Sequence, residues 1–171
     1  MNVLFLDVDG VLNSYSFYNS LSPEEKRTIP IDNSCLARVK RIVDASGALI
    51  VLTSSWRGGW DPDPARMELE GRILTDLFDK HGLSIYSKTP DTYPGNRAME
   101  IIQWMKDQAK KIHKYVILDD VDYNWSDYHM ARHWVPTDYY QGGLTDTETE
   151  KAIELFGKSS FYFFRERFSR A

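Results

Sequence analysis

The chain has 171 residues, of which 42% are hydrophobic and 27% charged, as expected for one globular domain with a substantial core. No apolar run approaches the roughly 20 residues that a membrane helix needs, and no signal peptide is evident, so we expect a cytoplasmic protein without a membrane partner. The net charge of −4 argues against broad nucleic-acid affinity but is compatible with a local basic groove. The single cysteine, Cys35, excludes an internal disulfide and is expected to be a small core residue rather than a nucleophile.

Short apolar runs alternate with helical patterns along the chain. In chain order the pattern predicts a strand at 3–6, a helix at 33–46, a strand at 48–52, a helix launched by the turn at 61–64, a strand at 84–86, a loop at 87–96, a helix from Arg97, a strand at 115–118, an edge strand at 132–135 ended by Pro136, and a helix from Thr145 to Gly157.

The helix ends carry recognisable signals. Position 32 or 33 can cap the helix at 33–46, and Gly47 can end it. Thr145 and Glu148 form a capping box. The alternation predicts a Rossmann-like, open α/β parallel sheet with helices on both faces, in one domain over 1–171. The core would span about 1–157, followed by an aromatic tail, 158–171, that docks on the core or on a partner chain.

Three of the predicted strands end in polar residues, namely Asp7, Thr53 and Asp119. Ligands of open parallel sheets bind beyond the carboxyl ends of the strands, so these side chains should face one crevice. Asp7 and Asp9 bracket one residue and leave an extended chain on the same face. With Asp120 they would repel one another unless a hard dication such as Mg²⁺ neutralised them. The sequence therefore predicts a magnesium site.

These residues resemble the four motifs of the haloacid dehalogenase (HAD) superfamily, in order. The segment 7–13 (Asp-Val-Asp-Gly-Val-Leu-Asn) resembles the first motif and Thr53 the second. Arg97 stands where the third motif has a basic residue, and 119–120 resembles the acidic fourth. The resemblance spans roughly 2–145, and in detail the chain is similar to the HAD domain of multifunctional RNA-repair proteins and to polynucleotide 3′-phosphatases.

The resemblance implies a phosphatase that works through an aspartyl-phosphate. Asp7 would attack phosphorus, and Asp9 would protonate the leaving oxygen and then activate water. Mg²⁺ would lie between Asp7, the backbone carbonyl of Asp9, and Asp119, with Asp120 holding a water or orienting the other ligands.

Five residues are candidates for binding the phosphoryl group. Thr53 would donate to a phosphoryl oxygen, with Ser54 as the alternate. Arg97 replaces the family's commoner lysine and brings a planar fork suited to phosphate, while Lys88, in the preceding loop, is its rival. Arg57 either holds phosphate or faces solvent.

The gaps in which the superfamily inserts cap domains are short here, so we expect a capless or minimally capped site. An open site accepts large substrates, and the resemblance points first to a phosphorylated nucleic-acid end, then to a phosphoprotein or nucleotide. Tyr15, Phe17 and Tyr18 would line the entrance. Trp56 and Trp60 would either pack the loop or stack a nucleobase.

Two alternatives belong to other functional classes. A receiver-type signalling domain also gathers acids, Mg²⁺ and a hydroxyl, but its phospho-acceptor lies in the third strand, whereas the Asp-x-Asp pair comes first here. A catalytically silent phosphate-binding module would keep the fold, and the intact pair of Asp7 and Asp9 disfavours it. The physiological substrate, the oligomeric state and any kinase or ligase partner stay open.

Overall fold

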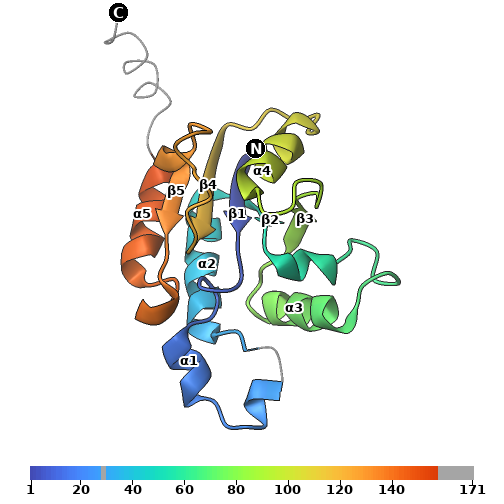
Figure 1. Ribbon diagram of the computed structural model, residues 1–171, viewed down its shortest axis with the longest axis vertical. Coiled ribbons are helices and arrows are strands. Elements are labelled where there is room, and N and C mark those ends of the chain that lie inside the picture. The colour runs from blue at the N-terminus through green and yellow to red at the C-terminus, as the bar shows by residue number, and fades with distance from the viewer. Residues whose placement is uncertain (28–29, 158–171) are drawn as a thin grey trace, which may run out of the picture.

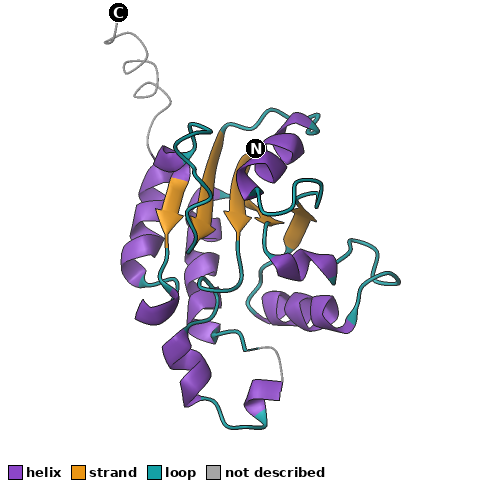
Figure 2. Cartoon of the chain, in the orientation of Figure 1, coloured by secondary structure: helices purple, strands orange, loops and turns teal. Residues whose placement is uncertain are grey.

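The computed structural model describes residues 1–27 and 30–157, which form a five-stranded parallel sheet between helices (Figure 1; Figure 2). The strands are β1 (Asn2–Leu6), β2 (Leu49–Leu52), β3 (Ile85–Lys88), β4 (Lys114–Asp119) and β5 (Trp134–Pro136). Their order is β3-β2-β1-β4-β5, and every neighbouring pair is parallel. The predicted α/β sheet is therefore confirmed, whereas the aromatic tail at 158–171 lies outside the described residues.

In the described part of the chain, five α-helices connect or flank the strands. They are α1 (Tyr15–Ser20), α2 (Asn33–Ser46), α3 (Leu69–Lys80), α4 (Arg97–Lys106) and α5 (Asp146–Gly157), with 3-10 turns η1 (Glu25–Arg27), η2 (Ser55–Gly58), η3 (Ala131–His133) and η4 (Tyr139–Gln141). Helix α2 has the predicted bounds because the Asp32 carboxylate accepts from the Ser34 amide at 2.8 Å and Gly47 adopts φ 62°. Within the described ranges, no helix is long and apolar enough to cross a bilayer.

Three elements differ from the expected positions. Helix α3 begins at Leu69 rather than directly after the 61–64 turn, where Asp61 and Asp63 accept backbone N–H groups and hold the chain in turns. Strand β3 ends at Lys88, which pairs with Leu52 and is therefore a strand residue rather than a loop residue.

The edge strand is also shorter than expected. Residues 131–133 form the 3-10 turn η3, so β5 begins at Trp134 instead of 132. Pro136 pairs with Asp119 as its last residue. A proline is tolerated there because β5 is the edge of the sheet and the missing N–H leaves no ladder position unpaired.

The sheet has an apolar layer on each face because successive strand residues point to opposite sides. Val3 and Phe5 pack with α4, whereas Leu4 and Leu6 pack with α2, α3 and α5. The helical side chains that cover the two faces are Ala98, Ile101 and Trp104 on the first, and Leu36, Val39, Ile42, Leu74, Phe78, Ala152 and Phe156 on the second. Helices on both faces are thus confirmed.

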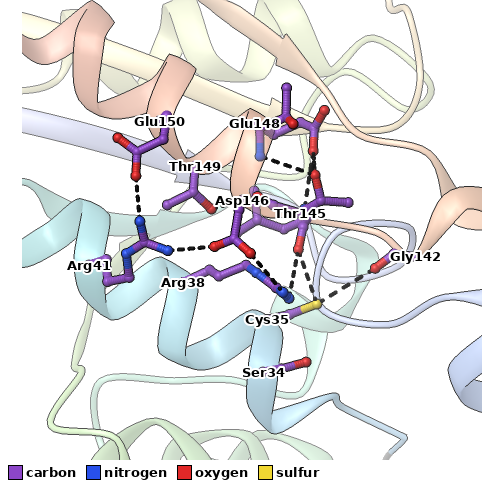
Figure 3. Close-up of polar contacts among 12 residues, drawn as sticks. Ser34, Cys35, Arg38, Arg41, Gly142, Thr145, Asp146, Glu148, Thr149 and Glu150 are labelled. Carbon is purple, nitrogen blue, oxygen red and sulfur yellow. Dashed lines mark hydrogen bonds and ion pairs between the residues drawn. The ribbon is translucent and has the colours of Figure 1, made fainter.

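Ion pairs join α2 to the start of α5 (Figure 3). Arg41 contacts Asp146 at 2.5 Å and also Glu150, and Arg38 contacts Asp146 at 3.3 Å. Arg38 also donates to the Leu144 carbonyl at 3.3 Å. Exposed pairs of this kind contribute less than about 1 kcal/mol each, so apolar packing rather than charge holds α5 on the sheet.

Cys35 lies beneath this junction and has the core role expected of it. Its side chain is fully buried (Figure 3). Its thiol lies 3.6 Å from the Leu144 carbonyl. Burial, with the nearby Asp32 carboxylate as the second cause, raises the pKa of Cys35 to about 11. A thiol of this kind stays protonated and is a poor nucleophile at neutral pH.

His133 makes the fold sensitive to acid. Its ring stacks on Tyr115 with centroids 4.0 Å apart, and its Nδ1 contacts the Tyr115 carbonyl at 3.1 Å. Burial, followed by the charge of Arg132, lowers the pKa of His133 to about 4. Since the unfolded chain takes up this proton near pH 6.5, the stability that the neutral ring contributes above that pH is lost as pH falls towards 4.

We therefore expect His133→Gln to flatten the pH dependence of stability. Between pH 7 and pH 5 the wild type should lose about 1–2 kcal/mol of unfolding free energy through this residue, a value reduced for partial exposure, and the variant should not. Urea unfolding of both chains at the two pH values measures the difference. Parallel losses in the two chains would contradict the assignment.

Candidate active site

Three strand ends bring polar side chains to one edge of the sheet. Asp7 directly follows β1, Thr53 follows β2, and Asp119 closes β4, and all three side chains are buried. Backbone hydrogen bonds between neighbouring strands keep these strand ends aligned. The Asp7 amide donates to the Leu118 carbonyl at 3.0 Å, and the Thr53 amide donates to the Leu6 carbonyl at 2.9 Å. The chain leaves β1 towards β2 on one side and returns as β4 on the other, so this edge is the topological switch point where open sheets bind ligands.

The carboxylates of Asp7, Asp119 and Asp120 form a cluster in which one oxygen of each lies within 4.8 Å of the others. Gly10 makes the approach of Asp120 possible, since a Cβ at position 10 would lie 2.2 Å from the Asp120 Oδ2 atom. Its φ of 74° also favours glycine. The glycine of the first motif is therefore needed for both space and backbone conformation.

Arg97 contacts two members of this acidic cluster. Asn96 caps α4 by accepting from the Met99 amide at 3.1 Å, which sets the first turn of the helix beside the strand ends. The Arg97 guanidinium then lies 3.0 Å from the Asp7 Oδ1 atom and 2.5 Å from the Asp119 Oδ2 atom. The guanidinium also lies over the Tyr123 ring, with its Cζ atom 4.7 Å from the ring centroid.

The cluster holds more negative charge than Arg97 neutralises. Burial raises the pKa of Asp7, and Arg97 offsets only part of this effect. Burial, followed by the charge of Asp7, raises the pKa of Asp119 to about 7 and that of Asp120 in the same direction. Burial alone would lower the pKa of Arg97, but Asp7 and Asp119 raise it above its usual range. Three carboxylates with one guanidinium fit a hard divalent cation such as Mg²⁺, which prefers oxygen ligands.

The two hydroxyls of the second motif, those of Thr53 and Ser54, have different surroundings. Burial raises the pKa of Asp7, and the nearby Ser54 hydroxyl opposes this effect. The Thr53 Oγ1 atom is fully buried and has no hydrogen-bond partner among residues 1–27 and 30–157. A buried hydroxyl without a partner is costly, and a phosphoryl oxygen at this edge would satisfy it.

Asp9 is exposed and lies outside the acidic cluster. Its Oδ1 atom accepts from the Asn13 side-chain amide at 2.8 Å, and its Oδ2 atom accepts from the Trp56 indole at 2.9 Å. The Asn13 side-chain oxygen in turn accepts from the Gly10 amide at 2.9 Å. Two side-chain donors therefore fix the orientation of this carboxylate.

Arg57 and Lys88 support the loops around the site. The Arg57 guanidinium is mostly buried and contacts Glu100 at 2.9 Å, Asp91 at 3.0 Å and the Thr53 carbonyl at 2.5 Å. The Lys88 ammonium donates to the carbonyl of Arg57 at 3.0 Å and to that of Trp60. Of the two rivals for the basic role, Arg97 is the residue that contacts Asp7.

Three contacts at the site were not predicted from the sequence, namely the Trp56–Asp9 and Asn13–Asp9 hydrogen bonds and the ion pair of Arg57 with the buried Glu100. Asn13 belongs to the first motif, so its spacing of four from Asp9 was a readable signal. Glu100 precedes Ile101 on the apolar face of α4, where a lone acid indicates a buried partner. Nothing in the sequence indicated the Trp56 contact.

Two pockets flank the strand ends. A pocket of about 400 Å³ is bounded by Asp9 and Asp120 together with Tyr18 and Tyr139. Another, of about 410 Å³, lies on the Arg97 side and reaches Arg57, Lys88 and Tyr123. Of the three aromatic residues expected at the entrance, Tyr18 lines the first pocket, whereas Tyr15 and Phe17 line neither pocket. Tyr15 is 52% exposed and its ring contacts those of Tyr139 and Tyr140.

A parallel sheet of this order with four such motifs at its carboxyl edge defines a HAD-type domain, a class associated with phosphatase chemistry. The chain belongs to the family described as the HAD domain in Swiss Army Knife RNA repair proteins, whose model matches residues 3–149. The resemblance inferred from the motifs is thereby confirmed. No curated protein matches the chain, and no solved structure does.

Proposed function

We propose that this domain is a Mg²⁺-dependent phosphatase that forms an aspartyl-phosphate on Asp7. The observation that carries the proposal is the buried juxtaposition of Asp7 with Arg97, Asp119 and Asp120. A nucleophilic carboxylate, a guanidinium and further acids for a cation are the parts that phosphoryl transfer needs. A bound Mg²⁺ would offset phosphoryl charge, and its ligands would be the three clustered carboxylates and the Asp9 backbone carbonyl.

The side chains divide the reaction between them. Asp7 attacks phosphorus while Arg97 and the Thr53 hydroxyl hold the phosphoryl oxygens. Asp9, on the exposed side of the cluster, gives its proton to the leaving oxygen and afterwards takes one from the water that hydrolyses the intermediate. The phosphate is released and both carboxylates return to their starting state.

The proposed substrate is a phosphorylated nucleic-acid end or another bulky phosphoester. In the described chain the segment between β1 and α2 holds only α1 and η1, so no folded unit of domain size is inserted there. The exposed ring of Tyr18 lines the pocket that also holds Asp9 and Asp120, where a base can stack. The family description, which names RNA repair proteins, supports the same substrate class.

Phosphate release tests this proposal directly. The full chain would be assayed on p-nitrophenyl phosphate and on 3′- and 5′-phosphorylated oligonucleotides, with Mg²⁺ or with EDTA. We expect Mg²⁺-dependent turnover and preference for one oligonucleotide end. A folded, Mg²⁺-binding chain that hydrolyses none of these compounds would instead be a silent phosphate-binding module.

Thr53→Val should separate catalysis from stability. The valine has the same shape but no hydroxyl, so kcat/KM should fall at least about 10-fold while the unfolding free energy stays equal or rises, because a buried unpaired polar atom is removed. Thr53→Ser, which keeps the hydroxyl, should retain most of the activity. A destabilised Thr53→Val chain would indicate that the hydroxyl has a structural partner.

A further inference from the structure

The orientation of Asp9 depends on a residue that is distant in sequence. Trp56 lies 47 positions away, in η2, and its indole N–H donates to the Asp9 Oδ2 atom at 2.9 Å. The Trp56 backbone amide faces the Ser54 hydroxyl at 3.3 Å, and its ring packs partly against the core. The ring is therefore anchored at its backbone and on one face while its N–H reaches the first motif.

Asp9 has little else to hold it. The residue is exposed, and its second side-chain bond comes from Asn13, which belongs to the same turn. A local bond restrains the carboxyl group relative to its own turn, whereas the bond from Trp56 fixes it relative to the β2 end, where Thr53 and Ser54 lie. Only the second restraint sets the distance between the proton donor and a phosphoryl group held at Thr53.

We propose that Trp56 is a positioning residue that holds Asp9 in the orientation from which it protonates the leaving oxygen. The inference rests on the proposed function. In the step concerned, the bond between Asp7 and phosphorus forms, the bond from phosphorus to the leaving oxygen breaks, and that oxygen takes the Asp9 proton and departs as an alcohol. Asp9 is left as a carboxylate, and it recovers a proton from the attacking water.

This role predicts an effect that depends on the leaving group. A phosphorylated oligonucleotide end is an alkyl phosphate, and its leaving group is a strongly basic alkoxide unless the oxygen is protonated. Its hydrolysis therefore needs a well-placed acid. The p-nitrophenolate ion is a weak base and departs without a proton. Loss of a purely structural tryptophan would lower the hydrolysis rates of both substrates by the same factor. Loss of a positioning residue lowers the rate for the alkyl phosphate selectively.

Trp56→Phe tests the inference, since it keeps the ring and removes the N–H. We expect kcat/KM for a phosphorylated oligonucleotide end to fall at least about 10-fold, with kcat/KM for p-nitrophenyl phosphate within about threefold of wild type. The comparison uses kcat/KM because this constant covers the steps up to departure of the leaving group and excludes the later hydrolysis of the intermediate, which is common to both substrates. The ratio of the two rates is independent of the folded fraction. Asp9→Asn should change the ratio in the same direction and further.

Trp60→Phe is the matched control, because Trp60 follows in the same loop but packs its ring in the core. Its rate ratio should equal that of wild type. Equal slowing of both reactions by Trp56→Phe, or no slowing of either, would overturn the role of Trp56 while leaving the phosphatase proposal intact. Absence of wild-type turnover on every substrate would overturn both.

Discussion

Replacing Asp7 with asparagine is expected to lower Mg²⁺-dependent phosphate release at least about 10²-fold without destabilising the protein. An amide oxygen is a poor nucleophile and a weaker cation ligand than a carboxylate. The folded chain should tolerate the change because burial already disfavours the Asp7 charge, and Arg97 keeps its contact with Asp119. The unfolding free energy should therefore fall by no more than about 1 kcal/mol. A rise also fits this expectation, because removing a functional charge often stabilises a protein.

Asp122→Asn provides the control for this experiment. Asp122 is exposed, lies next to the acidic pair, and accepts from the Trp125 amide at 3.1 Å, a bond that asparagine can also make. We expect its activity to match that of wild type. Rates measured by inorganic phosphate release, with stability measured by urea unfolding, decide the outcome, and an active Asp7→Asn chain would refute the nucleophile assignment.

Replacing Arg57 with methionine is expected to destabilise the protein by about 3 kcal/mol or more. Glu100 is 3% exposed, and Arg57 is its ion-pair partner at 2.9 Å. Without the guanidinium the carboxylate is left buried and uncompensated, and the carbonyls of Thr53 and Ser54 lose a donor. Breaking one side of a buried pair costs much more than removing the whole pair.

The pH dependence and a double variant identify the cause. Burial raises the pKa of Glu100 and Arg57 lowers it, so the variant should have a still higher pKa at Glu100. A raised carboxyl pKa means that the folded state binds the proton more tightly, and the deficit should shrink as pH falls from 7 to 5. Adding Glu100→Gln should likewise restore part of the lost unfolding free energy.

The same variant tests whether Arg57 binds phosphate. A phosphate-binding arginine that contributes little to the fold would raise KM with almost no loss of stability. The contacts of Arg57 favour the opposite result, in which stability falls and KM measured on the remaining folded protein changes little. Urea unfolding and steady-state kinetics on one preparation separate the two roles.

The sequence alone determined the fold class and the presence and order of the five strands, although the bounds of β3 and β5 differ from the prediction, and it indicated the polar residues at the strand ends. Apolar runs that stop at Asp7, Thr53 and Asp119 define parallel strand ends, because burial on both faces demands continuous apolar residues and the strand tips face solvent or ligand. Local signals also determined helix α2, since its cap at Asp32 and its end at Gly47 depend only on neighbouring residues.

Only the tertiary structure decided which basic side chain contacts Asp7 and which ones stabilise the loops around the site. Arg97, Lys88 and Arg57 are all plausible phosphate ligands by residue type, and they differ in the partners that folding brings to them from distant segments. The Trp56–Asp9 bond likewise joins the ends of two neighbouring strands. Periodicity shows which face a residue occupies but not what lies opposite it, because the opposing atoms belong to segments tens of residues away.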